Sequence, residues 1–248
     1  MDDLQQTMTE LSQALRSPDP VVRDERAYPA LRALIPRLEP QQRLELGDAM
    51  AERFEDPQIQ ARTFAPLILA ALVEQGSYAP HWVAAFARWY PAERDLRGYD
   101  GELGWLHAVA HGADLLGALG LHSPADPAAL LELGAARMLA PAGQLWDAME
   151  DERLGYALAR TLTRPELTPA QSVDWLDAVA ADFLAGEPGP VPYHASNTLR
   201  TLWMLALCAE RGVRTERHGD GERRQLTHRE AVRGRLVEVL AIISPYLA

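Results

Sequence analysis

The sequence predicts an all-α protein in which antiparallel helix pairs stack in chain order into a superhelix of the HEAT or armadillo kind. Leucine, alanine, arginine and glutamate recur at helical spacings of three and four residues, and runs of alternating β-branched residues do not occur. Four candidate helix starts place a capping residue directly before proline, at 19–20, 56–57, 126–127 and 168–169. The first two starts are 37 residues apart, close to the length of one helix-pair repeat. Because no side-chain consensus recurs at that period, an irregular helical bundle stays open as the alternative.

The predicted helix starts share one local chemistry. An Asp or Thr side chain at the cap accepts a hydrogen bond from an otherwise unpaired backbone N–H, and proline at the first helical position has no N–H to leave unpaired. Thr168 also has Gln171 three residues on, which is the pattern of a capping box. From these signals we expect helices over 3–16, 20–37, 40–55, 57–75, 79–94, 101–120, 127–140, 144–163, 168–185, 196–211 and 227–246.

Residues 1–248 are expected to form a single domain. The connections between the predicted helices are short, with two exceptions. The segment 186–196 cannot be helical through its prolines, and the segment 212–227 is polar, charged and contains glycine. The second segment predicts a mobile loop.

Composition excludes several classes of function. The formal net charge of −11 opposes binding to nucleic acid and to anionic membranes, because their negative charges favour a basic surface. No lysine occurs, which excludes Schiff-base chemistry, a P-loop lysine and a lysine general base. Cys208 is the single cysteine, so neither an intramolecular disulfide nor a thiolate zinc cluster can form.

The sequence also predicts where the protein resides. No apolar run reaches the roughly 18 to 20 residues needed to span a bilayer. The acidic segment 1–15 lacks the basic-then-apolar order of a signal peptide. We expect a cytoplasmic protein that does not enter membranes, with an unknown small molecule or protein as its partner and with no oligomeric state indicated.

Three polar side chains stand out in an apolar segment. His107, His111 and Asp114 follow one another at spacings of four and three residues. On a helix over 101–120 they would fall within about 60° of arc. Because this helix is apolar nearly all round, we expect it to be buried, so the three side chains must face solvent, a polar cleft or a metal.

A metal site is the first interpretation of this pattern. Two imidazoles four residues apart on one helical face, His107 and His111, can bind one zinc, iron or manganese ion. A carboxylate from Asp114, Asp151 or Glu152 would complete the site. The glutamate base of an H-E-x-x-H motif is missing from the run. Apart from this divalent metal, no cofactor is expected.

Two further interpretations need no metal. In one, the two histidines act as hydrogen-bonding or general acid–base groups in a pocket, Asp114 orients one imidazole, and an organic ligand lies against Trp105 or Tyr99. In the other, the histidines belong to a polar network between helices and donate to backbone carbonyls or carboxylates. The sequence alone leaves all three open.

Two later segments supply further candidate ligand-binding residues. "MEDERLG" places Glu150, Asp151, Glu152 and Arg153 at the start of a helix. Acids there complement the helix dipole and offer the two histidines a carboxylate, and the arginine pairs with one of these acids or reaches a ligand. "SNTLR" places Asn197 at or beside a helix N-cap, with Arg200 one turn later on the same side. These two residues either form a cap and a surface ion pair or line the cleft, where arginine could hold a carboxylate or phosphate.

The segment "RDLRGYDGELGWLHAVAHGADLL" resembles the hallmark of a bacterial family described as domain of unknown function 2785. Members carry an Arg-Gly-Tyr lead-in, a tryptophan and a His-x-x-x-His-x-x-Asp run. "MEDERLGYAL" and "SNTLRTLWML" are similar to the family as well, and the resemblance extends from about residue 20 to about residue 245. Leu106 stands where alanine is expected. The resemblance implies an all-α fold and no known activity.

The function expected from these observations is binding. We expect a binding or scaffold protein with a polar pocket around His107, His111 and Asp114. The alternative is a metal-dependent, hydrolase-like enzyme that uses the two histidines and a nearby carboxylate. Whether the protein is an enzyme is not decided at this level.

Overall fold

The computed structural model describes every residue except 1, 123, 215–222, 245 and 247–248, and it is mostly helical, as predicted. Two very short antiparallel strand pairs were not expected. Three helical segments are not α-helical: a π-helix η1 and the 3₁₀ segments η2 and η3. In chain order the elements are α1 (Asp2–Ala14), η1 (Val21–Ala27), α2 (Tyr28–Leu34), η2 (Ile35–Arg37), α3 (Pro40–Glu52), η3 (Arg53–Glu55), α4 (Ile59–Glu74), α5 (Pro80–Ala92), β1 (Tyr99–Asp100), β2 (Gly104–Trp105), α6 (Ala108–His122), α7 (Pro127–Leu139), α8 (Glu150–Thr161), α9 (Leu176–Leu184), α10 (Tyr193–Arg211), β3 (Val213–Arg214), β4 (Arg223–Arg224) and α11 (Arg229–Ala241).

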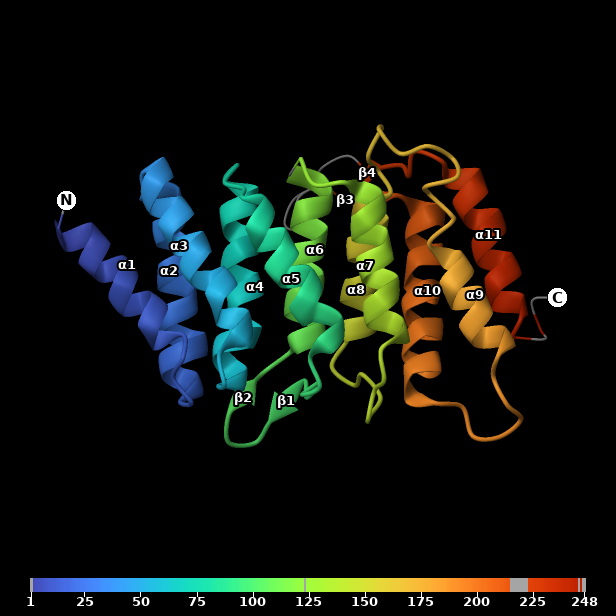
Figure 1. Ribbon diagram of the computed structural model, residues 1–248, viewed down its shortest axis with the longest axis horizontal. Coiled ribbons are helices and arrows are strands. Elements are labelled where there is room, and N and C mark those ends of the chain that lie inside the picture. The colour runs from blue at the N-terminus through green and yellow to red at the C-terminus, as the bar shows by residue number, and fades with distance from the viewer. Residues whose placement is uncertain (1, 123, 215–222, 245, 247–248) are drawn as a thin grey trace.

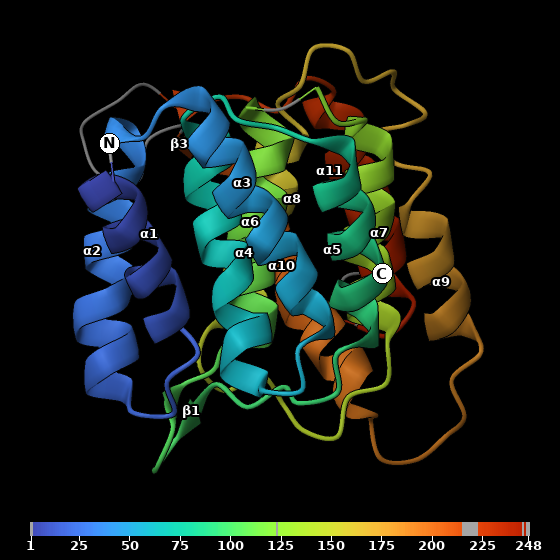
Figure 2. The same ribbon diagram turned by 60° about the vertical axis from the view of Figure 1, so that its left-hand side comes forward.

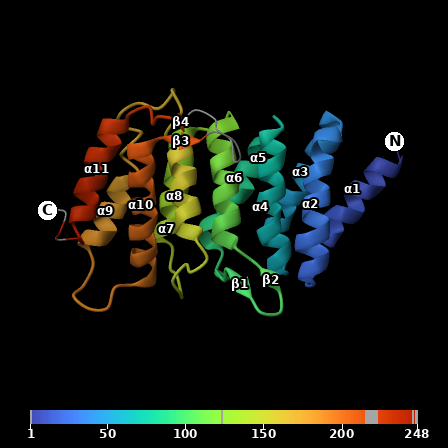
Figure 3. The ribbon, with the colours of Figure 1, turned by 180° about the vertical axis from the view of Figure 1, so that it is seen from behind.

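The helices lie in two layers. Helices α4, α6, α8 and α10 lie side by side in one layer, and α3, α5, α7 and α9 form the other (Figures 1 and 3). Figure 2 shows the α5–α7–α9 layer separated from the layer that contains α6 and α8. Helices α1 and α2 lie at one end of the row and α11 at the other. Consecutive helices therefore alternate between the two layers, and helices two apart in the chain pack side by side within one layer.

Helix α6 is largely buried, as its apolar sequence predicts. It packs between α4 and α8, and nearly all of its residues are buried. The next two helices of this layer, α8 and α10, also pack closely. A Cβ atom added at Gly155 on α8 would lie 2.6 Å from the carbonyl oxygen of Thr201 on α10, so only glycine permits this approach. The candidate site is thus built on closely packed helices.

The side chains predicted as caps bond backbone N–H groups near the expected helix starts. Asp126 is the N-cap of α7, whereas the N-cap residues of η1 and α4 are Pro20 and Gln58. The Asp19, Asp56 and Asp126 carboxylates each accept a hydrogen bond, at 2.9 to 3.0 Å, from the backbone N–H two residues on. Thr168 and Gln171 make the reciprocal bonds of a capping box at 3.0 and 3.2 Å. The segment that follows forms turns, so α9 begins at Leu176 and the predicted start at 168 is wrong.

The helix predicted over 101–120 begins at Ala108 instead. Residues 99–105 form a hairpin in which Tyr99 pairs with Trp105 and Asp100 with Gly104. The Leu106 N–H then donates to the Gly98 carbonyl at 2.9 Å, which holds the chain extended up to the helix. The sequence prediction is therefore wrong for residues 101–107, which lie in the hairpin and the extended segment before the helix.

Two other predicted boundaries differ. The helix expected over 144–163 begins at Glu150, because residues 144–149 form a loop bonded to α10. Helix α10 begins at Tyr193 and not at 196, so the predicted cap at Asn197 is wrong and this residue lies inside the helix. In the segment predicted as a mobile loop, β3 and β4 pair at its ends, and residues 215–222 lie outside the described part of the chain. Within that part, no helix is both long and apolar enough to cross a membrane.

Candidate functional site

His107 lies at the junction between the β1–β2 hairpin and α6. It is buried, with 7 % of its surface exposed, and its φ of +48° is rare for a residue other than glycine. Its carbonyl oxygen accepts the His111 N–H at 2.8 Å, so it occupies the capping position of the helix. Its ring is stacked between the Trp105 ring, 4.4 Å away between centroids, and the His111 ring, 5.5 Å away. The two histidines are therefore neighbours, as their spacing predicts.

His111 is fixed by α4. Its Nδ1 lies 2.9 Å from the Thr63 carbonyl oxygen, and because a carbonyl only accepts, Nδ1 carries the proton of this hydrogen bond. The Phe64 ring packs edge-on against the imidazole at 5.2 Å. In the neutral tautomer Nε2 is then the acceptor nitrogen of the ring.

Asp114 does not orient either imidazole through Nδ1. Its carboxylate forms a two-point ion pair with Arg153 of α8, with Oδ1 3.3 Å from Nε and Oδ2 bonded to a terminal nitrogen. Both side chains are partly exposed. Arg153 thus pairs with Asp114 of α6 and not, as predicted, with one of the neighbouring acids at 150–152.

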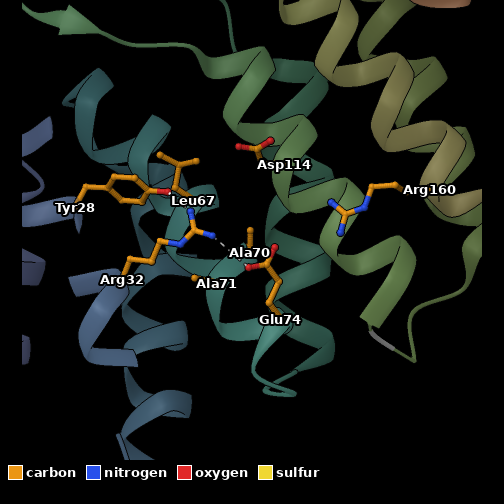
Figure 4. Close-up of a pocket in the computed structure, with 8 residues that line it drawn as sticks. All are labelled: Tyr28, Arg32, Leu67, Ala70, Ala71, Glu74, Asp114 and Arg160. Atoms are coloured by element: carbon orange, nitrogen blue, oxygen red, sulfur yellow. Dashed lines mark hydrogen bonds and ion pairs between the residues drawn. The ribbon is translucent and has the colours of Figure 1, made fainter. Parts of the chain in front are cut away.

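These side chains line one open cleft of about 430 Å³. Its floor comes from α4 and α6, one wall from η1 and α2, the other from α8, and Trp105 closes one end. A smaller pocket shares Tyr28, Arg32, Leu67 and Asp114 with the cleft and is lined further by Ala70, Ala71, Glu74 and Arg160 (Figure 4). The lining residues of the cleft are Asp24, Tyr28, Arg32, Phe64, Leu67, Trp105, His107, His111, Asp114 and Arg153.

The wall from η1 is locked to the hairpin by a buried arginine. Arg23 is fully buried and donates to the carboxylate of Asp24 at 2.7 Å and to the backbone carbonyls of Leu103 and Trp105. Its guanidinium also lies over the Phe64 ring at 4.9 Å. Burial raises the pKa of the Asp24 carboxyl, although Arg23 opposes the shift. The π-helix thereby presents Asp24 to the cleft.

Trp105 and Tyr99 both come from the β1–β2 hairpin at one end of the cleft. Their rings meet edge-on at 4.9 Å, and both are exposed, Trp105 at 44 % and Tyr99 at 61 %. Trp105 lines the cleft directly, whereas Tyr99 supports it from outside. An exposed aromatic ring stacked on a buried histidine offers a face on which a ligand can pack.

The remaining predicted residues form a separate network away from the cleft. Asn197 is fully buried, and its Oδ1 accepts the N–H of Trp146 at 3.0 Å while its Nδ2 donates to the Gln144 carbonyl at 3.2 Å. Arg200 donates to the Trp146 carbonyl at 2.6 Å and pairs with Asp151 at 2.5 Å. This network holds the loop before α8.

Glu152, the last of the predicted residues, is exposed on α8 and does not line the cleft. The carboxyl group beside the histidines is that of Glu150, one of the acids at 150–152 that the sequence offered as helix-dipole residues and as candidate carboxylates for the two histidines. It is 1 % exposed, and its Oε1 lies 3.6 Å from His107 Nδ1. Its Oε2 accepts the Ala148 N–H at 2.8 Å.

Electrostatics keep His107 neutral. Burial lowers the pKa of its imidazole to about 4, and Arg153 lowers it further, while Asp114 and Asp147 oppose the shift. Burial has the opposite effect on Glu150, where it raises the pKa of the carboxyl. Both groups therefore favour their uncharged forms, which leaves the imidazole available as a proton donor or acceptor.

The metal interpretation stays a prediction. The described residues contain no group of three or more His, Cys, Asp or Glu side chains arranged to hold a metal ion. Nδ1 of His111 bonds to a carbonyl and Nδ1 of His107 faces Glu150, so a metal could meet these rings only through Nε2.

Sequence reasoning missed the residues of η1 and α2 that form one wall of the cleft. Asp24, Tyr28 and Arg32 come from a segment about 80 residues before the histidines, and no local pattern connects them. Glu150 was among the acids at 150–152 that the sequence offered, and nothing local distinguished it from Asp151 and Glu152 as the one that faces His107.

These features define an α-helical protein of two packed layers with a polar cleft floored by α4 and α6. A family described as "Protein of unknown function (DUF2785)" matches residues 49–207, and the chain belongs to this family. The match covers more than half of the chain, a narrower range than the resemblance suggested. No curated protein and no solved structure matches the chain.

Proposed function

We propose that the protein binds a small, uncharged, polar organic molecule in the cleft around His107, His111 and Asp114. The cleft volume of about 430 Å³ falls within the range of small-molecule sites, roughly 300–1,000 Å³. Imidazole, phenol and indole groups offer hydrogen bonds and flat apolar faces together. With such a ligand the protein is a binding protein. Binding and scaffold proteins together are the broader class that we propose.

The proposal of an uncharged ligand is supported by the ion pairs that the charged residues of the cleft lining form. Asp24 is paired with Arg23, and Asp114 with Arg153. Arg32 lies 3.6 Å from Glu74 and also donates to the Tyr28 hydroxyl at 3.1 Å. A charged ligand would have to displace one of these partners, which costs free energy, whereas an uncharged ligand would not.

Three further proposals accompany this one. The two helical layers are of the HEAT or armadillo kind, residues 1–248 form one domain, and the protein resides in the cytoplasm. The alternation of helices between layers supports the first. The metal-dependent hydrolase stays the alternative prediction, and no described carboxylate joins the two imidazoles as a third metal-binding group.

An NMR titration tests the proposed binding. The probes are small uncharged amides, alcohols and heteroaromatic fragments, with acetate and inorganic phosphate as charged comparators. We expect at least one uncharged probe to shift the ring signals of His107, His111 and Trp105 saturably, and Trp105→Ala to weaken its binding at least fivefold.

Trp203→Ala is the matched control, because Trp203 on α10 is about as exposed as Trp105 but does not line the cleft. Three results would contradict the proposal: no uncharged probe shifts these signals, the two variants bind alike, or a charged probe binds more tightly.

A further inference from the structure

His107 and Glu150 confront each other with two buried atoms that lack hydrogen bonds. His107 Nδ1 and Glu150 Oε1 are 3.6 Å apart, and neither has a hydrogen-bond partner among the described residues. The two side chains are 9 % and 1 % exposed. Buried polar atoms are nearly always bonded, because an unpaired one loses its water without compensation. The pair is therefore held together at a cost in stability.

Backbone strain is concentrated on the same pair. Among the described residues, His107 and Met149 are the two non-glycine residues with positive φ, at +48° and +65°. Met149 directly precedes Glu150, so each partner of the pair is placed by one strained residue. Such strain persists only where the surrounding structure imposes it, and it clusters at functional sites.

The absence of a side chain at Gly98 makes room for the Glu150 carboxyl group next to His107. A Cβ atom added there would lie 2.7 Å from Glu150 Oε1 and 2.6 Å from the Ala148 side chain. The Gly98 carbonyl also accepts the His107 N–H, at 3.3 Å. With Oε2 bonded to the Ala148 N–H, the carboxyl group is fixed with Oε1 aimed at the imidazole.

We propose that Glu150 and His107 form a proton-transfer pair that equips the cleft for acid–base catalysis on an uncharged carbonyl compound. His107 lines the cleft, and because Nδ1 faces Glu150, Nε2 is the nitrogen that meets the bound molecule. Glu150 is the positioning residue behind it. This proposal rests on the proposed binding of an uncharged ligand.

The proton transfer balances within the pair. Nε2 gives its proton to an oxygen or nitrogen of the substrate and keeps the electron pair of the broken N–H bond. Nδ1 takes the proton of Glu150 Oε1, which leaves a carboxylate. The imidazole ends neutral in its other tautomer, and one proton has moved from Glu150 to the substrate. The reverse sequence lets Nε2 accept a proton from water.

The groups facing His107 are Glu150, Arg153, Asp114, Asp147 and the His111 ring. Burial raises the pKa of Glu150 and lowers that of His107, so the proton rests on the carboxyl when both are neutral. Ionisation of Glu150 should then move the imidazole proton from Nε2 to Nδ1.

Ring-nitrogen NMR of the full chain without ligand tests the pair. As the pH rises through the titration of the Glu150 carboxyl carbon, followed in the same samples, we expect His107 to change from the Nε2–H to the Nδ1–H tautomer with the same midpoint. Glu150→Gln should abolish the change. Glu152→Gln, the same substitution at an exposed acid two residues on, should leave it intact. A fixed tautomer, or a change that survives Glu150→Gln, would overturn the proposal, as would two different midpoints in the wild type.

A kinetic measurement tests the catalytic role. The probe is 4-nitrophenyl acetate, an uncharged ester. We expect Glu150→Gln to lower kcat at least tenfold with little change in KM, and to remove from the pH–rate profile the step at the tautomer midpoint. Equal profiles in the wild type and Glu150→Gln would overturn the catalytic role. Because the NMR test uses no ligand, it separates failure of the pair from failure of the proposed binding.

Discussion

Two buried polar groups lie on either side of the start of α8. They differ in whether their polar atoms have hydrogen-bond partners. Asn197 is fully buried, and both ends of its amide are bonded to the loop backbone. The His107–Glu150 pair is buried nearly as deeply, yet its facing atoms are unbonded and its backbone is strained. The comparison teaches that burial alone does not identify a site. A satisfied polar group stabilises a fold, whereas an unsatisfied and strained one indicates a role beyond it.

The largest predicted effect concerns pH. The folded pKa of His107, about 4, lies below the unfolded value of 6.5, so the unfolded chain binds the proton first as pH falls. Stability contributed by this group is complete above pH 6.5 and is lost toward pH 4, by about 3 kcal/mol in full. Glu150 opposes this in part, because its raised pKa adds stability at low pH.

Urea unfolding of wild type and His107→Gln from pH 7.5 to 4.5 measures this contribution. The wild type should lose more free energy of unfolding on acidification than the variant. His81→Gln is the control, since His81 is exposed. Equal losses in wild type and His107→Gln would contradict the expected burial of the imidazole.

The next effect tests the satisfied network. Asn197→Ala leaves the Trp146 N–H without its acceptor, and the free energy of unfolding should fall by about 2 kcal/mol. Ser196→Ala, one residue away and only partly buried, should change it by less than about 0.5 kcal/mol. Chemical denaturation checks both. If the two variants lose the same stability, the loop network does not have the structural role assigned to it.

The smallest effect is a gain in stability. Met149 is 62 % exposed, so Met149→Gly loses little packing and relieves the positive φ. We expect the free energy of unfolding to rise by about 0.5–1 kcal/mol. Leu145→Gly, at an exposed residue of the same loop with negative φ, should give no gain. A loss in Met149→Gly would show that this backbone position is not strained.

Much of the fold could be predicted because its causes are local. Apolar periodicity and the caps at Asp19, Asp56 and Asp126 predicted most helices, since each signal lies within a few residues of the structure it produces. The start of α6 was missed because hydrogen bonds from residues 106–107 to the preceding 97–98 backbone outweigh the helical pattern of 101–107.

The residues of the site also divide into those that the local sequence predicts and those that contacts between distant segments bring together. His107 and His111 could be paired from their spacing, and Arg153 could be expected to find an acid. Glu150 could be named only as one of three adjacent acids, because the turn at Met149 directs it toward His107 and a helix-start acid has a simpler explanation. Asp24 approaches the histidines because Arg23 bonds η1 to the hairpin, and Arg32 approaches them through the packing of α2 on α4.

The free energy of unfolding of Glu150→Gln at pH 7, measured beside that of Asn197→Ala, tests the central claim most directly. If the His107–Glu150 pair is held in place for chemistry and not for stability, Glu150→Gln will be as stable as the wild type or more so, while Asn197→Ala will lose about 2 kcal/mol. A loss in Glu150→Gln as large as that in Asn197→Ala would contradict the account, because Glu150 would then be one more structural member of the core.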